Sequence, residues 1–436
     1  MKTFTINLNK KQIFLFLTTI VVFGLIIRLF DAYNEVHFFD LNFYVDWSTK
    51  AFDDGIFNIY SVSQGMEVDY PPVLIFFFYI TGGILRNPNI MNFDPNLMLA
   101  LKMWQIIFDV AIIVLIYFVL KKQNELLALA FSAVWAVNPA IIFNSSTWGQ
   151  TDSVMIFMLL LTFVVLESKR PILATVLFAL SCMTKFQCAY FAPVFILFMV
   201  FSKYSLRQLI HSAATGVITV LTVFLPFMIV SGIALPINIY TGGFDKYKYA
   251  TLYAFNLYGC FNFNFHPDDK IFFLGMTIHD FGTMMTVIAL IATVTLFLIA
   301  RKKCPYLLSF FIMNTIFIFA SRMHERYQIP VLIFLLIAAA RHKSTKLFVS
   351  FILTTIIVFL NHAIAFEYIL NNRDNRVPWM NNIDAIFKWT SIANVLLYFI
   401  TLFVTILCLY DLDKKFSDYI RQLIKKMLGG VKLAKT

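Results

Sequence analysis

Long apolar stretches alternate with short polar segments along almost all of the 436 residues. Most stretches hold about 15–25 residues, which suits a bilayer because a transmembrane helix needs roughly 20. Twelve of them are predicted as membrane helices: 13–30, 98–120, 125–143, 154–167, 171–184, 188–202, 208–231, 273–300, 305–320, 328–341, 347–366 and 390–410. A helix satisfies its backbone hydrogen bonds within one segment, so the pattern predicts an all-α polytopic membrane protein.

The lysines and arginines follow the same alternation. If the amino terminus is cytoplasmic, twelve of the 35 lie in short inner loops, three at the amino terminus and seven in the tail. This distribution satisfies the positive-inside rule at every inner loop. The net charge of +11 is therefore explained by topology, and no nucleic-acid partner is expected.

The topology leaves two long outer segments, 31–97 and 232–272, which are expected to carry juxtamembrane helices. The stretch Val73–Leu85 is apolar but short, so a re-entrant or interfacial helix is predicted there. Residues 1–410 are expected to form one membrane domain. Residues 411–436 form a basic amphipathic tail, predicted to lie on the anionic inner leaflet.

The polar motifs of the chain all fall on the outer side of this topology. They are Asp40, Asp46, Asp69-Tyr70-Pro71-Pro72, Trp148-Gly149-Gln150-Thr151-Asp152-Ser153, Lys185-Phe186-Gln187, Asn256 and His324-Glu325-Arg326-Tyr327. Acids, bases and cations gathered at one face suit chemistry at a lipid surface, whereas a transporter more often has charges near the bilayer midplane. Asp109 is the one clear intramembrane exception, and an interhelical hydrogen bond would explain it.

Asp40 precedes residues with the spacing of an amphipathic helix, which ends near Asp54-Gly55. The carboxylate can cap that helix, act as a general base, or do both. Asp46 on the same helix is the fallback base. Lys185 and Arg326 are the cations expected to pair with a phosphate, and the alternative for both is contact with lipid headgroups.

The other motifs have structural readings beside the functional ones. Asp69 and Tyr70 can line a polar site, while the two prolines that follow fix the start of a short helix. Trp148 is by default an interfacial anchor, and Asp152 can cap the next helix. Asn144-Ser145-Ser146 is formally a glycosylation sequon, although it lies close to the membrane.

Taken in order, the Asp-Tyr-Pro-Pro, Trp-Gly-Gln-x-Asp-Ser, Lys-x-Gln and His-Glu-Arg-Tyr motifs resemble a family. It comprises bacterial membrane mannosyltransferases related to the second GPI mannosyltransferase. More distantly, the motifs are similar to those of the ER glucosyltransferases of the dolichol pathway. All of these enzymes have the GT-C glycosyltransferase fold, and the resemblance extends from Asp40 to about Asn361.

The resemblance implies inverting transfer of a hexose, mannose or glucose-like, from a polyprenyl-phosphate sugar on the non-cytoplasmic face. It makes Asp40 the general base and makes His324 and Arg326 ligands of the donor phosphate. Lys185 and Gln187 match the family's Lys-Pro-Gln motif, with Phe186 in place of the proline. Asn256 begins a segment like the family's Asn-x-Trp pattern, with tyrosine replacing tryptophan. Gln150 and Glu325 are expected to support the site, Glu325 by pairing with a neighbouring cation.

Two other functions compete with glycosyl transfer: a transporter or flippase of lipid-linked glycans, and a noncatalytic scaffold for envelope assembly. The expected partners are the lipid-phosphate donor, membrane lipids and an acceptor that is a glycan, a lipid-linked glycan or a protein. The expected location is a bacterial cell membrane, or the ER membrane with a lumenal site. No cofactor is required, although Asp40, Asp69 and Asp152 can share a divalent cation.

Overall fold

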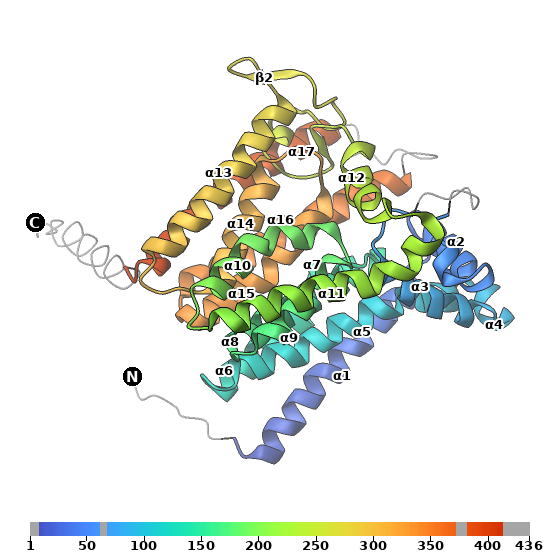
Figure 1. The fold of residues 1–436 in the computed structure, drawn as a ribbon, viewed down its shortest axis with the longest axis horizontal. Coiled ribbons are helices and arrows are strands. Elements are labelled where there is room, and N and C mark those ends of the chain that lie inside the picture. Colours follow the sequence, from blue (N-terminus) through green and yellow to red (C-terminus); the bar gives the residue numbers. More distant parts are fainter. Residues whose placement is uncertain (1–7, 62–67, 372–381, 413–436) are drawn as a thin grey trace, which may run out of the picture.

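The computed structural model describes residues 8–61, 68–371 and 382–412, and most of their regular structure is helical. The α-helices are α1 (Lys10–Asn34), α2 (Leu41–Asp53), α3 (Pro72–Leu85), α4 (Pro88–Met91), α5 (Asp94–Leu120), α6 (Glu125–Ala136), α7 (Pro139–Ile142), α8 (Asp152–Glu167), α9 (Pro171–Cys182), α10 (Ala192–Val200), α11 (Leu206–Ser231), α12 (Leu235–Lys246), α13 (Ile278–Ile299), α14 (Pro305–Phe319), α15 (Ile329–His342), α16 (Thr345–Asn371) and α17 (Ile383–Leu409). Figure 1 shows how they are arranged.

Shorter elements join these helices. A π-helix, Phe143–Trp148, follows α7, and 3-10 helices include Phe186–Phe191 before α10 and Glu325–Gln328 before α15. Strand β1 (Thr251–Leu252) pairs in parallel with β4 (Met323–His324). Strand β2 (Ile271–Phe273) pairs antiparallel with β3 (Met276–Thr277). These strands are the only departures from the predicted all-α class among the described residues.

Six described helices are long and apolar enough to cross a membrane: α1, α5, α11, α13, α16 and α17. The pair Glu125–Ala136 and Pro139–Trp148, bent by 48°, gives a seventh if it is one span. This supports an all-α polytopic membrane protein. Each of the twelve predicted stretches overlaps a helix, but α8, α9, α10, α14 and α15 have only 9 to 16 residues. The number twelve therefore stays a prediction.

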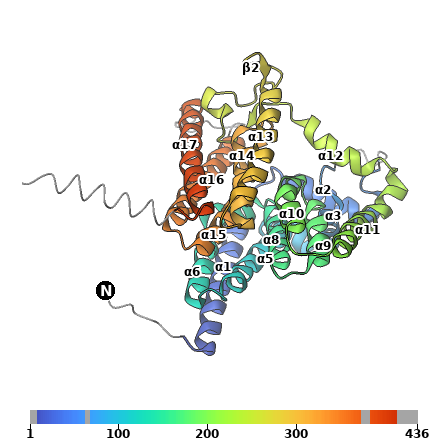
Figure 2. The ribbon, with the colours of Figure 1, turned by 60° about the vertical axis from the view of Figure 1, so that its left-hand side comes forward.

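The short helices α14 and α15 lie in the interior, whereas several of the long helices are largely exposed. Every residue from Ile329 to Ala340 in α15 is buried, as expected for a helix that is apolar on all faces. By contrast, only 17% of the most apolar 18 residues of α1 and of α11 are buried, and 22% of those of α13. Figure 1 shows α1 and α13 along the edge of the molecule, and Figure 2 shows α11 at its right-hand edge, so the apolar faces of these three helices are available to lipid.

The first outer segment forms a compact platform at one end of the molecule. Helix α3 coincides with the predicted interfacial helix at Val73–Leu85 and packs tightly against α2. A Cβ atom built at Gly82 would come within 2.0 Å of the backbone oxygen of Ser48, so only glycine permits this approach. Tyr44 and Trp47 of α2 pack their rings on Phe78 of α3. The platform thereby fixes the start of α2, where Asp40 lies.

The second outer segment crosses the same end of the molecule. Figure 2 shows α12 running from the end of α11 towards the β2–β3 hairpin above α13. The parallel pairing of β1 with β4 joins this segment to the loop between α14 and α15. Tyr253 also forms a bridge to His324. The predicted outer segments thus lie together around the α14–α15 loop.

The predicted inner loops contact one another away from this platform. Glu167, which ends α8, accepts hydrogen bonds from Tyr306 Oη at 2.7 Å and Arg341 Nη2 at 2.9 Å. Lys302 Nζ lies 2.6 Å from Asp411 Oδ1. These contacts join the ends of α8, α15 and α17 to the start of α14. Of the predicted tail, residues 413–436 lie outside the described residues.

One sequence interpretation needs correction: Asp109 is not an isolated intramembrane charge. Arg28 Nε lies 2.6 Å from Asp109 Oδ2, and both side chains are fully buried. Lys102 is also buried and donates to the backbone oxygen of Glu35 at 2.8 Å. Arg28 and Lys102 were overlooked because their apolar neighbours dominate the hydropathy of α1 and α5. Asp109 does make the expected interhelical bonds, accepting from Trp135 and Ser145.

Candidate active site

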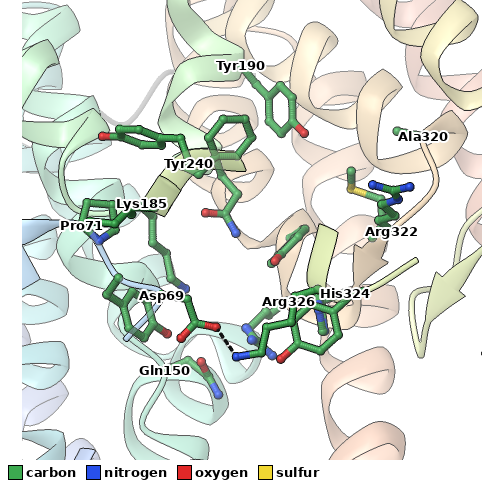
Figure 3. Close-up of a pocket in the computed structure, with 18 of the residues that line it drawn as sticks. Asp69, Pro71, Gln150, Lys185, Tyr190, Tyr240, Ala320, Arg322, His324 and Arg326 are labelled. Atoms are coloured by element: carbon green, nitrogen blue, oxygen red, sulfur yellow. Dashed lines mark hydrogen bonds and ion pairs between the residues drawn. The ribbon is translucent and has the colours of Figure 1, made fainter. Parts of the chain in front are cut away.

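A cavity of about 640 Å³ lies between the platform, α12 and the loop that joins α14 to α15. Its polar and aromatic lining comes from segments far apart in the sequence (Figure 3). The predicted site residues that line it are Asp40, Asp46, Asp69, Tyr70, Gln150, Lys185, Gln187, His324 and Arg326. The structure therefore brings nine of the thirteen candidates to one cavity.

Asp40 is held by residues more than 100 positions away. Its Oδ2 atom accepts hydrogen bonds from Trp148 Nε1 at 3.0 Å and from Gln150 Nε2 at 2.5 Å. It occupies the position before α2, but its side chain makes no capping hydrogen bond, so the N-cap interpretation is wrong. Trp148 is 1% exposed and is not an interfacial anchor. These two donors fix one carboxylate oxygen while the residue faces the cavity.

Arg326 contributes a positive charge to the same cavity. Its Nη1 atom lies 2.8 Å from Glu325 Oε1, and the Glu325 side chain is 2% exposed. Burial alone would raise the pKa of Glu325, but the Arg326 charge and the neighbouring His324 lower it to about 2. Burial opposes the charge of Arg326, yet Glu325 and Asp40 together raise its pKa well above the usual value. Glu325 thus pairs with the neighbouring cation, as the sequence predicted.

His324 lies beside Arg326 and is 12% exposed. Burial lowers its pKa below the usual value, and the Arg326 charge acts in the same direction, while Glu325 opposes the shift. Its Nδ1 atom is 3.8 Å from Glu325 Oε2, beyond direct hydrogen-bond distance. A neutral imidazole at pH 7 can donate one hydrogen bond, but it adds no full charge to the cavity.

Lys185 supplies a second cation to the cavity, and the buried carboxylate of Asp152 holds it in place. Its Nζ atom lies 2.8 Å from Asp152 Oδ1, with the two side chains 5% and 1% exposed. The ammonium also lies 5.8 Å from the centre of the Tyr70 ring. Asp152 begins α8 but Thr151 is its N-cap residue, so the capping interpretation of Asp152 is wrong. The carboxylate orients Lys185 instead.

Asp69 and Tyr70 close another side of the cavity. Asp69 Oδ2 lies 2.9 Å from Lys246 Nζ of α12, the contact drawn in Figure 3. Tyr70 and Tyr44 share a hydrogen bond of 3.3 Å between their hydroxyl oxygens. Burial raises the pKa of Tyr44 well above its usual value, so this hydroxyl stays protonated. Asp46 lines the rim on the exposed side of α2.

Four sequence candidates do not line the cavity. Trp148, Asp152 and Glu325 lie directly behind it and contact residues that do. Asn256 is fully buried, and its Oδ1 atom accepts from the backbone nitrogens of Tyr258 and Gly259. Asn256 therefore shapes a turn and does not contact the cavity.

Sequence reasoning missed Lys246 and the pairing of Arg322. Lys246 lies in α12, where no motif surrounds it, and its position became apparent only through its contact with Asp69. Arg322 also lines the cavity, and its Nε atom lies 2.6 Å from Asp268 Oδ2. The signal for Arg322 was its place beside His324, but its partner lies 54 residues away. Neither contact is encoded in local spacing.

A metal site shared by Asp40, Asp69 and Asp152 is not supported by this geometry. No group of three or more His, Cys, Asp or Glu side chains in the described part of the chain is arranged to hold a metal ion. Asp69 contacts Lys246, and Asp152 contacts Lys185. The cavity instead combines the Asp40 carboxylate, held by neutral donors, with several cations. Such a site can accept a proton from a hydroxyl and stabilise a phosphate.

One comparison with known proteins bears on this site. The model of Glycosyltransferase family 87 matches residues 69–321. The match includes Asp69, Gln150, Lys185 and Lys246, and it ends before His324 and begins after Asp40. No curated protein matches the chain.

Proposed function

The chain belongs to glycosyltransferase family 87, and we propose that it transfers a hexose from a polyprenyl-phosphate sugar to an acceptor hydroxyl. The observation that carries the proposal is that one cavity of the helical bundle is lined by both the Asp40 carboxylate and the Arg326 guanidinium, and that the charge of Asp40 helps to raise the pKa of Arg326. The resemblance to mannosyltransferases favours mannose or a glucose-like hexose. A GT-C-like arrangement with twelve spans belongs to the same proposal.

In the proposed reaction, Asp40 removes the proton from the acceptor hydroxyl. The oxygen attacks the anomeric carbon from the face opposite the phosphate, so the C–O bond forms as the bond to phosphate oxygen breaks. The polyprenyl phosphate leaves with the electron pair, and the configuration inverts. Asp40 suits this role because Trp148 and Gln150 hold only its Oδ2 atom, and the described residues offer Oδ1 no hydrogen bond.

The leaving phosphate gains negative charge as the reaction proceeds. Arg326 can form a bidentate contact with it and Lys185 can supply a point charge, both already oriented by buried carboxylates. His324 would add a neutral hydrogen bond. Lys246 is a further cation that the sequence did not reveal. Its ion pair with Asp69 is partly exposed to the cavity, so the Lys246 ammonium can exchange Asp69 for the substrate phosphate.

The lipid donor is supported by the position of the cavity. It lies beside α13, most of whose apolar surface is exposed, and Gly282 and Thr283 of α13 are among its lining. The predicted inner loops that carry most of the lysines and arginines contribute none of its lining, so the positive-inside rule favours the non-cytoplasmic face for the cavity. That face is the outside of a bacterial membrane or the lumen of the ER.

The transporter alternative gains nothing from the buried charges. Arg28 and Asp109 form an intramembrane pair, but neither lines the cavity. Their hydrogen bonds go to Gly24, Trp135, Ala136 and Ser145, which suits a structural role. No observation favours this alternative over the transferase.

The donor class is tested with purified protein in lipid nanodiscs. Radiolabelled hexose is offered either as a polyprenyl-phosphate sugar or as a nucleotide sugar, together with a total lipid and glycan extract as acceptor. We expect label in product from the lipid donor only. Transfer from the nucleotide sugar alone would contradict the proposal, and movement of intact lipid-linked glycan across the bilayer without transfer would favour the transporter.

A further inference from the structure

The π-helix Phe143–Trp148 contacts both halves of the proposed site. It follows α7 and ends at Gly149, whose φ of 78° is left-handed. Residues Asn144 to Trp148 are all buried. π-helices are rare and occur frequently at functional sites. Trp148 is the last residue of this element and holds the carboxylate of Asp40.

Asn144 contacts the other half of the site through Asp152. Its Nδ2 atom lies 3.2 Å from Asp152 Oδ2 and 3.4 Å from His362 Nε2. His362 Nδ1 lies 2.9 Å from the backbone oxygen of Val358, so Nδ1 carries the proton and Nε2 is an acceptor. The amide nitrogen of Asn144 therefore donates. A flipped amide would place its oxygen against a carboxylate and a lone pair.

Asp152 is thus held by two donors, one at each oxygen. Asn144 donates to Oδ2, and Lys185 contacts Oδ1 at 2.8 Å. A carboxylate with both oxygens engaged has a fixed orientation, and the ammonium paired with it is fixed as well. The direction of the Lys185 ammonium therefore depends on Asn144.

The π-helix is itself anchored deep in the membrane domain. Ser145 Oγ donates to Asp109 Oδ2 at 2.9 Å, and the same oxygen lies 2.6 Å from Arg28 Nε. Trp135 Nε1 donates to the other oxygen of Asp109 at 2.9 Å. The buried Arg28–Asp109 pair therefore has a structural role in holding the π-helix. It fixes the six-residue element that reaches Asp40 at one end and Asp152 near the other.

We propose that Asn144 is a positioning residue that orients the phosphate-binding Lys185 through Asp152. The π-helix then sets the distance between the general base and this cation. The inference rests on the proposed function, because it takes Lys185 as a ligand of the lipid phosphate. It also assigns the formal sequon at Asn144 a purely internal role, since the side chain is buried and inaccessible to glycosylation.

The test is a double-mutant cycle with Asn144→Ala, Lys185→Met and both together. The readouts are the affinity for undecaprenyl phosphate, compared with undecaprenol, and the rate of transfer. Asn144→Ala alone is expected to weaken lipid-phosphate binding about tenfold and transfer about 10- to 100-fold, since a small misplacement of a reacting group has such effects. When Lys185 is already methionine, Asn144→Ala is expected to lower lipid-phosphate affinity and the transfer rate by less than about threefold.

Thr162→Val is the matched control, because Thr162 is a buried polar residue of α8 that bonds only the backbone of Met158. If Asn144→Ala does not fold, Asn144→Leu, which has nearly the same volume and no hydrogen-bond donor, takes its place in the cycle. The inference would be overturned if the change at Asn144 lowered binding and transfer equally with and without Lys185, or lowered neither. It would also be overturned if the protein bound undecaprenol as tightly as undecaprenyl phosphate. The proposed function fails separately, if Asp40→Asn retains full transfer while lipid-phosphate binding is intact.

Discussion

At the scale of single residues, the sequence identified most of the chemistry but little of the geometry. Asp40, Lys185 and Arg326 were candidates because charged residues beside apolar spans are costly and few. Their partners were assigned less well. Capping of α2 was one of two roles considered for Asp40, but donors from the Trp148–Gln150 stretch bind its carboxylate. Only Glu325 and Arg326, adjacent in the sequence, were paired in advance. Hydrogen bonds between residues far apart in the sequence cannot be predicted from the spacing of neighbouring residues.

The lowered pKa of His324 predicts a pH dependence of stability. The unfolded chain takes up a proton near the usual pKa of 6.5, whereas the folded protein does so only at lower pH. Unfolded protein therefore binds more protons as pH falls below about 6.5, and stability decreases. We expect His324→Gln to lose less thermal stability than wild type between pH 7.5 and 5.5.

Thermal unfolding of both proteins in the same detergent measures this difference. His37, whose pKa burial lowers to about 4, is present in both and cancels in the comparison. A steeper loss in the variant than in wild type would contradict a neutral His324.

At the scale of elements, apolar patterning located the helices, and the predicted interfacial segment at Val73–Leu85 became α3. The patterning did not reveal the π-helix Phe143–Trp148, because all but its first residue follow the predicted span 125–143 and have the polar character of a connecting loop. Nor did it show that α2 and α3 form a joint platform. That packing depends on a contact between Gly82 and Ser48, which involves no hydrophobic periodicity.

Gly82→Ala is expected to separate α2 from α3, because the new Cβ atom would lie 2.0 Å from the Ser48 oxygen. Since α2 carries Asp40, both thermal stability and transfer should fall. Gly242→Ala is the matched control, because that helical glycine has open space around its Cβ position. Equal behaviour of the two variants in thermal unfolding and transfer would show that the close approach does not support the site.

At the scale of the whole molecule, the alternation of spans and charged loops predicted that the polar motifs would gather at one face. Nine of the candidates do line one cavity. The number of spans could not be fixed from the sequence, because the interior helices are shorter than the bilayer is thick. A helix of 14 residues such as α15 extends only about 21 Å at 1.5 Å per residue.

The proposed orientation predicts opposite labelling of two exposed positions. Leu274→Cys lies in the loop between β2 and β3, and Lys122→Cys lies between α5 and α6. In intact cells a membrane-impermeant thiol reagent should label the cysteine at 274 and should reach the cysteine at 122 only after lysis. Wild type, which carries five native cysteines, gives the background. Labelling of 122 alone in intact cells would invert the topology.

The central claim is that Asp40 is the general base of a glycosyltransferase. The most direct measurement is hexose transfer from a polyprenyl-phosphate donor by Asp40→Asn, with Asp54→Asn at the exposed end of α2 as control. The account predicts a loss of about 10²- to 10⁴-fold for Asp40→Asn, with lipid-phosphate binding kept, and little change for the control. Undiminished transfer by Asp40→Asn, or a loss confined to Asp46→Asn, would contradict it.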